Sequence, residues 1–191
     1  LFTISRGRAM AALVPGGDAV ALGGKVTTIF LLGWACGGLF FGMLGDRIGR
    51  AKTMMITILM YSGCTGLSAF STGFWDFAFY RFLTGLGVGG EFAVGVALVA
   101  EVMPATARAG ALGLLQALSA VGNVTAALLG LWAADLEMKG TIPQGQGWRM
   151  LFVVGALPAL LAVLVRMRMK EPEQWRKAKE SGELAKRSAF T

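Results

Sequence analysis

The sequence predicts an all-α membrane protein in which five transmembrane helices form one bundle. Hydrophobic residues make up 55% of the 191 residues, charged residues make up only 15%, and the mean hydropathy is +0.63. Soluble domains usually carry about 25% charged residues. The apolar residues are gathered into runs close to the ~20 residues that a helix needs to cross a ~30 Å hydrocarbon core. We expect a bundle over 26–167, with spans at about 26–44, 53–71, 77–100, 110–133 and 149–166.

Two more polar segments flank this bundle. Residues 1–25 contain two arginines, Pro15 and the turn signal Gly16-Gly17-Asp18, so we expect an external loop or the tail of a preceding helix. The chain begins at Leu1 without the charged, apolar and small-residue regions of a signal peptide, and we therefore expect a fragment whose upstream segment is missing. Residues 168–191 are expected to form a basic cytoplasmic tail or an interdomain loop.

Basic residues are distributed unequally between the two sides of the predicted bundle. Eight of the 18 Lys and Arg lie after Leu164, on the same side as four others: Arg47, Arg50, Lys52 and Arg108. The opposite side carries Arg6, Arg8, Lys25, Lys139 and Arg149. Because Lys and Arg in short loops mark the cytoplasmic side, we expect a multi-pass protein of the inner or plasma membrane. The N-terminus of the chain would be external and its C-terminus cytoplasmic.

The composition argues against several other classes of function. A net charge of +7 would suit nucleic acid, but these basic residues flank apolar runs, as membrane topology and anionic lipid headgroups require. The chain has no histidine, and Cys36 and Cys64 lie inside apolar runs, so we predict no metal site, no cofactor and no enzyme. Gly85, Gly87 and Gly90 satisfy G-x-G-x-x-G, but the βαβ context of a dinucleotide site is missing.

The third span contains two ionisable residues. Glu91 lies 15 residues after Asp76, about 22 Å along a helix and therefore near the middle of the bilayer. Ionisable groups there by default mark functional sites. We interpret Glu91 as a proton-coupling or substrate-cation site, with a structural hydrogen bond between helices as the alternative. Arg81 lies about 15 Å from Glu91 along the same helix. It either snorkels outward, attracts an anionic or hydroxylated substrate, or gates the proton site.

Polar residues also follow one face of two other spans. On the fourth span, carboxamides and a hydroxyl share a face, formed by Gln116, Ser119 and Asn123. Such groups are costly in a membrane unless they are hydrated or paired, so we favour the lining of a cavity over hydrogen bonds between helices. On the second span, the shared face is formed by Thr57, Tyr61, Cys64, Ser68 and Ser71. For this face we favour hydrogen bonds to neighbouring helices.

Several motifs resemble those of one transporter superfamily. The loop Gly42-x-Leu44-x-Asp46-Arg47-x-Gly49-Arg50-x-Lys52 resembles the signature loop between helices two and three of the major facilitator superfamily. The run Arg81-x-x-x-Gly85-x-Gly87-x-Gly89-Gly90-Glu91 resembles the helix-four motif of its sugar-porter and metabolite:proton symporter branches. Three weaker similarities follow. The end of helix four in these branches resembles Glu101, Pro104 and Arg108. Helix six resembles Trp148-Arg149 and 155–158, and the run after helix six resembles 171–175.

The resemblance implies a fold and an activity. The superfamily has twelve helices in two halves, and this chain would supply helices two to six. Helix one and the C-terminal half, on the same polypeptide or a second chain, would be missing partners. The implied function is secondary active transport of a small polar metabolite, a sugar or an organic acid, by proton-coupled symport with alternating access. A non-transporting membrane sensor or scaffold, or an inactive transporter fragment, is the alternative.

The resemblance also implies roles for charged loop residues. It predicts a cytoplasmic gate network, in which one half of the transporter is held against the other and Glu101 pairs with one of the loop arginines. We call its predicted members, Gly42, Asp46, Arg47, Gly49, Arg50, Glu101 and Arg108, the gate network. Gln116, six residues before Gly122, weakly resembles a sugar-contacting glutamine in helix five of sugar porters. Topological charge with helix capping is the alternative for the loop positions.

Overall fold

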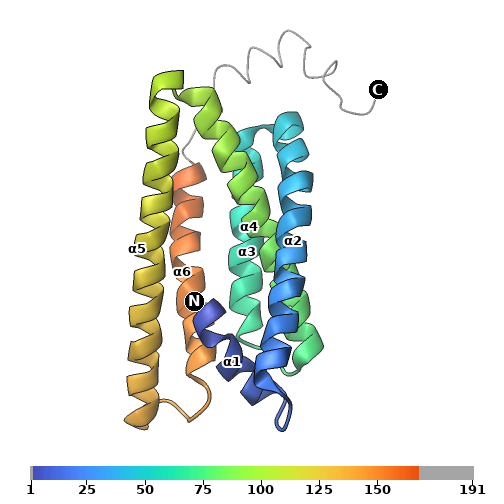
Figure 1. Cartoon of the computed structure of the whole chain (residues 1–191), viewed down its shortest axis with the longest axis vertical. Helices are drawn as coiled ribbons and strands as arrows, with labels where there is room; N and C mark the ends of the chain where they lie inside the picture. Colours follow the sequence, from blue (N-terminus) through green and yellow to red (C-terminus); the bar gives the residue numbers. More distant parts are fainter. Residues whose placement is uncertain (1, 168–191) are drawn as a thin grey trace.

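The computed structural model describes residues 2–167, which form helices without any strand (Figure 1). The helices are α1 (Phe2–Leu13), α2 (Ala19–Ile48), α3 (Arg50–Ser68), α4 (Phe74–Val102), α5 (Ala105–Met138) and α6 (Gly147–Met167). The predicted all-α class is therefore confirmed. The predicted tail, 168–191, lies outside the described residues.

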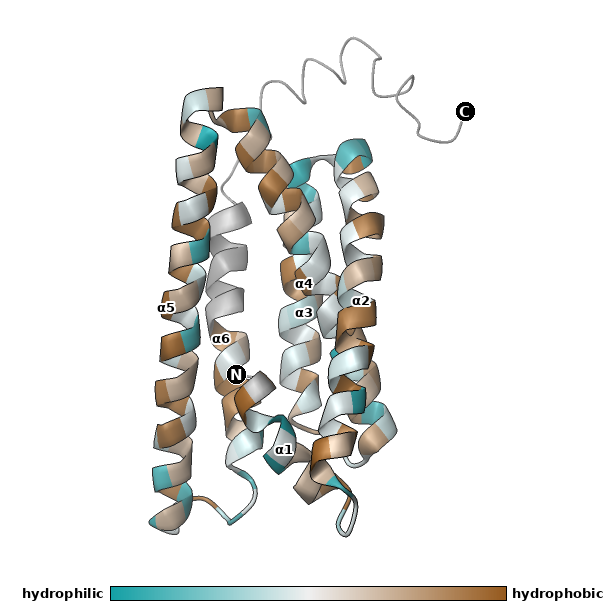
Figure 2. Ribbon diagram, in the orientation of Figure 1, coloured by the Kyte–Doolittle hydropathy of each residue, from teal (hydrophilic) through white to brown (hydrophobic). Residues whose placement is uncertain are grey.

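Each predicted span falls on one helix, from α2 to α6. Among the described residues, α2, α4 and α5 are long and apolar enough to cross a membrane. The 19 residues of α3 carry many hydroxyl groups, which lower its hydropathy. In α6 the side chains are described as far as Leu157, and this part of the helix is apolar. Figure 2 shows hydrophobic residues along the length of α2, α4 and α5, with hydrophilic residues more frequent near the helix ends.

For residues 1–25 we expected either an external loop or the tail of a preceding helix. Phe2–Leu13 forms a helix, which agrees with the second of these expectations, whereas α2 begins at Ala19 rather than near residue 26. The cause at α2 is Asp18, whose side chain accepts hydrogen bonds from the backbone N–H groups of Val20 (2.9 Å) and Ala21 (3.1 Å). A carboxylate at this position satisfies N–H groups that have no partner inside the helix.

Helix α1 belongs to the core of the bundle. Ala9, Met10 and Leu13 are buried in one cluster with Phe77 of α4 and with Trp148 and Phe152 of α6. The rings of Phe77, Trp148 and Phe152 meet in edge-to-face pairs with centroids 5.7–5.9 Å apart. This packing explains why a short helix with two arginines is ordered: one face supplies apolar contacts that a loop would leave exposed.

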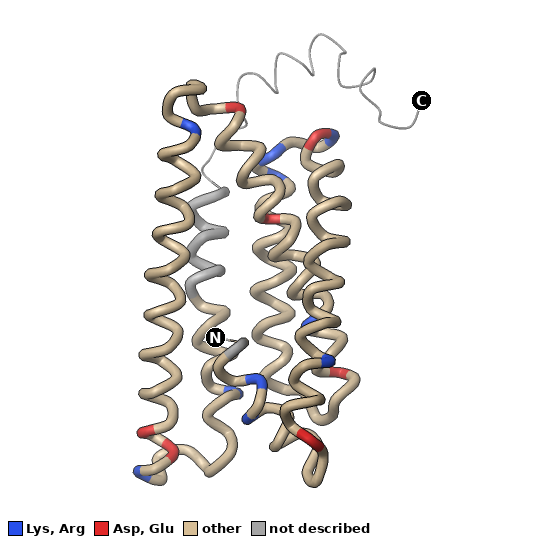
Figure 3. The backbone as a smooth tube through the Cα atoms, in the orientation of Figure 1, with Lys and Arg blue, Asp and Glu red and all other residues tan. Residues whose placement is uncertain are grey.

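The long helices run side by side with alternating direction (Figure 1). Helix α4 packs against both α2 and α3, α3 also packs against α6, and α5 lies beside α6. We call the end that contains the α2–α3 turn the Gly49 end, and the end that contains the α3–α4 turn the Gly73 end. Most charged residues lie toward these two ends (Figure 3).

Glycines bring α2 and α4 into backbone contact. A Cβ atom added at Gly37 would lie 1.9 Å from the carbonyl oxygen of Leu86, and one added at Gly89 would lie 1.9 Å from that of Trp34. Gly33 and Gly85 meet the opposite helix almost as closely, at 2.2 and 2.1 Å. Small residues spaced four apart allow such an approach between membrane helices. The α2–α4 pair therefore forms a seam in which no side chain separates the two backbones.

Arg149, at the start of α6, forms hydrogen bonds with the backbone at the end of α3. Its guanidinium donates to the carbonyl oxygens of Ala69 and Ser71, the latter at 2.9 Å, and it stacks on the ring of Trp148 at 4.5 Å. The last carbonyls of a helix have no partner within that helix, and a cation beside them also opposes the negative end of its dipole. The Gly73 end is thus stabilised by a contact between residues about 80 positions apart in the sequence.

Candidate functional site

A single residue, Gly49, joins α2 to α3. Its φ of 107° and ψ of 146° are accessible to glycine and strained for side-chain-bearing residues. Its N–H donates to the Gly45 carbonyl at 3.2 Å, which closes α2. Its own carbonyl accepts from both the backbone N–H of Thr53 (3.1 Å) and the Thr53 hydroxyl (2.9 Å), which opens α3. Gly49 therefore ends one helix and begins the next within one residue.

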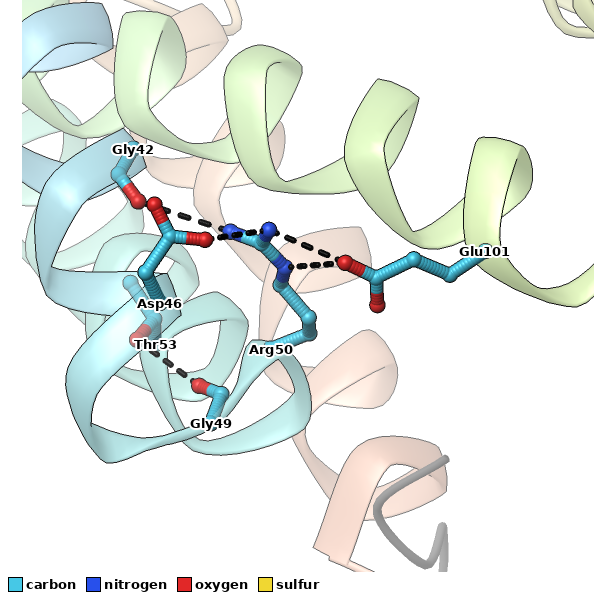
Figure 4. A network of polar contacts seen from close by, with 6 residues as sticks. All are labelled: Gly42, Asp46, Gly49, Arg50, Thr53 and Glu101. Atoms are coloured by element: carbon cyan, nitrogen blue, oxygen red, sulfur yellow. Dashed lines mark hydrogen bonds and ion pairs between the residues drawn. The ribbon is translucent and has the colours of Figure 1, made fainter. Parts of the chain in front are cut away.

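Arg50, directly after this turn, connects the ends of α2 and α4 (Figure 4). Its Nε and Nη2 donate to Glu101 Oε1 at 3.1 and 3.0 Å, and Nη2 lies 2.5 Å from Asp46 Oδ1. Its Nη1 donates to the Gly42 carbonyl at 3.4 Å. The Arg50 side chain is 11% exposed, against 62% for Asp46 and 28% for Glu101. We call Asp46, Arg50 and Glu101 the Arg50 cluster.

Gly45 makes room for this guanidinium, and Gly42 supplies a carbonyl that accepts a hydrogen bond from it. A Cβ atom at Gly45 would lie 3.1 Å from Arg50 Nη1 and 3.2 Å from a methyl group of Val94, so a larger residue would compete with both. Gly42 has more space, and its contribution is the carbonyl that accepts from Nη1. Gly42, Gly45 and Asp46 thus each accommodate or bind the Arg50 side chain, which folds back over the end of α2.

Two charged members of the predicted gate network lie outside the Arg50 cluster. Arg47 is exposed at the end of α2, and no ion pair joins it to another described residue. Arg108 donates from Nε to the carbonyl of Met103 at 3.1 Å, at the end of α4. Arg108 therefore caps a helix. The structure brings together Gly42, Asp46, Gly49, Arg50 and Glu101 (Figure 4). Arg47 and Arg108 do not take part in these contacts.

Replacing Gly49 with alanine tests the turn. We expect G49A to lower the free energy of unfolding by about 1–3 kcal/mol, because a Cβ atom is strained at this φ value. The melting temperature of the protein in detergent measures the effect. Gly24→Ala is the matched control, since it lies in α2 and a Cβ atom there would meet nothing within 4 Å. Equal melting temperatures for G49A and G24A would contradict the proposed strain.

Glu91 lies on the face of α4 that packs against α3. Its carboxylate and the Tyr61 side chain are close enough to interact electrostatically. The two helices approach closely here, since a Cβ atom at Gly87, one turn before Glu91, would lie 2.9 Å from both the Thr57 carbonyl oxygen and Tyr61 Cβ. The sequence placed Tyr61 on a polar face for interhelical hydrogen bonds but did not connect it with Glu91. The register in which α3 packs against α4 brings Tyr61 and Glu91 together.

Arg81 is buried and does not snorkel outward. It is 2% exposed, and it donates to the Ser68 hydroxyl from Nε (3.2 Å) and Nη2 (2.7 Å), and to the Thr84 hydroxyl from Nη2 (3.0 Å). A weaker bond reaches the Cys64 carbonyl at 3.5 Å. Aromatic rings of three helices lie 4.7–5.7 Å from its Cζ, namely Phe2, Phe77 and Phe152.

Among the described residues 2–167, no ion pair joins the Arg81 guanidinium to an acidic side chain. Hydroxyls, a carbonyl and π-faces partly replace water around the cation. A desolvated cation held in this way attracts an anion more strongly than one in water, because the effective dielectric constant is lower. The sequence analysis identified Arg81 but not its partner Thr84. Thr84 lies three residues after Arg81 on the same helix, and this spacing could have predicted the contact.

The three polar residues of the fourth span lie apart from these two sites. Gln116, Ser119 and Asn123 are all exposed on α5. Figure 1 shows α5 beside α6 and separated from α2 and α3 over most of its length. Within the described range, the structure joins none of the three to Glu91 or Arg81 by a hydrogen bond, so the predicted cavity face stays a prediction. The same range contains no group of three potential metal-ligating side chains.

Comparison with known proteins identifies the family. The model of the sugar (and other) transporter family matches residues 8–191. The chain belongs to this family. A family relative, a putative metabolite transport protein of Haemophilus influenzae, is 39% identical over 171 residues, which cover 90% of this chain and 39% of the relative. The cis,cis-muconate transport protein of Acinetobacter baylyi is 36% identical over 171 residues, 87% of this chain and 39% of that protein.

The fold agrees with solved structures of the superfamily. The proton:xylose symporter XylE of E. coli, a major facilitator superfamily protein, superposes with a TM-score of 0.78 at 20% identity, over 96% of this chain and 45% of that one. The predicted major facilitator fold is therefore confirmed. The family model and the transporter relatives confirm the prediction of a transporter-family protein rather than an enzyme. The chain spans about two fifths of the length of the curated relatives that it matches.

Proposed function

We propose that this chain is part of a secondary active transporter that moves a small polar metabolite together with a proton. The observation that carries the proposal is Glu91, an acid in the middle of an apolar helix that faces Tyr61 of α3. An ionisable group in that position is costly and by default functional. The relatives named for metabolite and muconate transport and the neighbour named as a proton:xylose symporter support this class of activity.

Organic acids are the first substrate class to test. Buried Arg81 offers a cation without an acidic partner among the described residues, and a carboxylate is the natural ligand of a guanidinium. One relative is named for the transport of cis,cis-muconate, which is a dicarboxylate. Sugars stay as the second class, because hydroxyl groups also accept hydrogen bonds from arginine and because the family model includes sugar transporters.

The proposed mechanism is alternating access. Glu91 takes up a proton as the substrate binds, and a rocking motion exposes both to the other side of the membrane. The Arg50 cluster closes the Gly49 end, which we place on the cytoplasmic side of the inner or plasma membrane, with the N-terminus of the chain external. The proton gradient supplies the energy, and each charge that crosses 100 mV is worth about 2.3 kcal/mol. A helix one and a C-terminal half, on the same polypeptide or a second chain, complete the transport path.

Replacing Glu91 with glutamine tests proton coupling. We expect E91Q to lose pH-driven accumulation in proteoliposomes while keeping counterflow exchange of substrate, because glutamine preserves shape but cannot bind and release a proton. Radiolabelled organic acids and sugars are supplied with and without an imposed pH gradient. Asp135→Asn is the matched control, since Asp135 pairs with Lys139 in an exposed position at the end of α5. Accumulation by E91Q with unchanged pH dependence would refute the coupling role.

The same assay separates a transporter from a scaffold. Uptake is measured with two proteins. The first is this chain alone, and the second is this chain together with a second half of the transporter. We expect transport only when a second half is present, because alternating access needs two bodies that move against each other. No uptake across a broad panel of sugars and organic acids under either condition would favour a non-transporting membrane sensor.

A further inference from the structure

We propose that Tyr61 is the positioning residue of Glu91: its hydroxyl donates to the Glu91 carboxylate across the α3–α4 interface and sets the pH at which this acid takes up a proton. The transport meaning of the pair rests on the proposed function, whereas the pair itself does not. Tyr61 and Glu91 belong to different spans and lie 30 positions apart, so only the packing of α3 against α4 brings them together.

Glycine 87 makes this pairing geometrically possible. Because a Cβ atom at Gly87 would lie 2.9 Å from Tyr61 Cβ and 3.0 Å from Tyr61 N, the backbone of α4 rests against the root of the Tyr61 side chain. Tyr61 therefore begins its side chain at the α3–α4 interface, at the level of Gly87. Glu91 is the residue one turn further along α4, on the same face of that helix.

The directions of the two side chains favour a meeting between them. Side chains in a helix lean toward the N-terminus of their own helix. Since α3 and α4 are antiparallel (Figure 1), Tyr61 leans toward the Gly49 end and Glu91 leans toward the Gly73 end. Ser68 of α3 lies beside Arg81 of α4, and Gly95 of α4 lies against Met54 of α3, which fixes the register on both sides of the pair.

Few other titratable groups face Glu91 from the helices packed around it. On α3, between Thr53 and Ser68, they are Tyr61 and Cys64, and on α2, between Val26 and Gly45, there is only the exposed Cys36. Along α4 itself, Arg81 and Glu101 each lie ten residues away, about 15 Å at the helical rise. Of these titratable residues on α2 and α3, Tyr61 is the one that lies against the turn of α4 that leads from Gly87 to Glu91.

This arrangement gives the hydroxyl a defined effect. A phenol that donates to a carboxylate stabilises the ionised acid relative to the neutral acid. Protonation of Glu91 removes the charge that this hydrogen bond stabilises, so the uptake of a proton and the weakening of the α3–α4 contact occur together. Tyr61 touches the acid and not the transported molecule, which makes it a positioning residue.

The test measures protonation of Glu91 without measuring transport. Dicyclohexylcarbodiimide, which reacts with neutral carboxyl groups in apolar surroundings, is added to the protein in proteoliposomes at stepped pH. Mass spectrometry then quantifies modification of the peptide that contains Glu91, and E91Q supplies the blank. We expect Tyr61→Phe to move the pH of half-modification upward by about one unit, because a donor to the ionised form is lost. Tyr80→Phe replaces the other tyrosine of the chain and should leave it unchanged.

A second variant keeps the test decisive if phenylalanine disturbs folding. Tyr61→Met removes the hydroxyl with a different shape and must move the profile in the same direction. An unshifted profile in Y61F or Y61M, with a wild-type size-exclusion profile, would overturn the inference. A shifted labelling profile with an unshifted pH profile of uptake would support the Tyr61–Glu91 pair and contradict the proton-coupling role of Glu91.

Discussion

Replacing Gly89 with alanine is expected to disrupt the fold. The added Cβ atom would lie 1.9 Å from the Trp34 carbonyl oxygen, and this backbone atom cannot move aside as a side chain could. Helices α2 and α4 would have to separate along their whole seam, with loss of packing at Gly33, Gly37 and Gly85. We expect a loss of more than about 4 kcal/mol, above the usual range for overpacking, because backbone contact leaves no room for repacking. Heating the protein in detergent and following the monodisperse fraction by size-exclusion chromatography measures this.

The same substitution at an open glycine should have the opposite sign. Gly113 lies in α5, and a Cβ atom there would meet nothing within 4 Å. Alanine is favoured over glycine in a helix by roughly 0.5–1 kcal/mol, so G113A should be as stable as the wild type or slightly more stable. If G89A and G113A behaved alike, the α2–α4 seam would not be the close contact that the structure describes.

Replacing Arg50 with alanine should have the second largest effect. The substitution removes the two hydrogen bonds to Glu101 Oε1, the ion pair with Asp46 and the bond to the Gly42 carbonyl. Glu101 would keep a carboxylate whose second oxygen, Oε2, is already buried without a hydrogen-bond partner in the described part of the chain. We expect R50A to lower the free energy of unfolding by about 2–3 kcal/mol, as for lost hydrogen bonds to a charged group that is partly exposed. Urea unfolding in micelles provides the measurement.

A double-mutant cycle with Glu101→Gln isolates the Arg50–Glu101 contact. We expect a coupling energy of at least about 1 kcal/mol between the two positions, because they touch directly. Arg50→Lys should recover only part of the loss, since a single ammonium group cannot reproduce the fork that reaches Glu101, Asp46 and Gly42 together. Additive effects of R50A and E101Q would show that the cluster contributes charge but no specific contact.

The sequence predicts which residues belong to the site more completely than it predicts which of them contact one another. Glu91 and Arg81 were identified because charges stand out in an apolar run, and Arg50 and Glu101 because of motif spacing. Which loop arginine meets Glu101 was open, and only the one-residue turn at Gly49 directs Arg50, rather than Arg47, toward α4. The contact of Tyr61 with Glu91 was invisible because pairing across two helices depends on their register.

The sequence by itself determined the class of protein, the positions of the long helices and the family. These follow from local quantities, namely hydropathy over about 20 residues, the spacing of glycines, and motif letters. Tertiary structure decided three further features. The first two are the packing of the helix formed by residues 2–13 and the contacts of Arg81 with three aromatic rings. The third is the exposure of Gln116, Ser119 and Asn123 on α5. The physical reason is that a helix presents several polar faces equally well, and the neighbour that packs against one of them selects which face becomes a site.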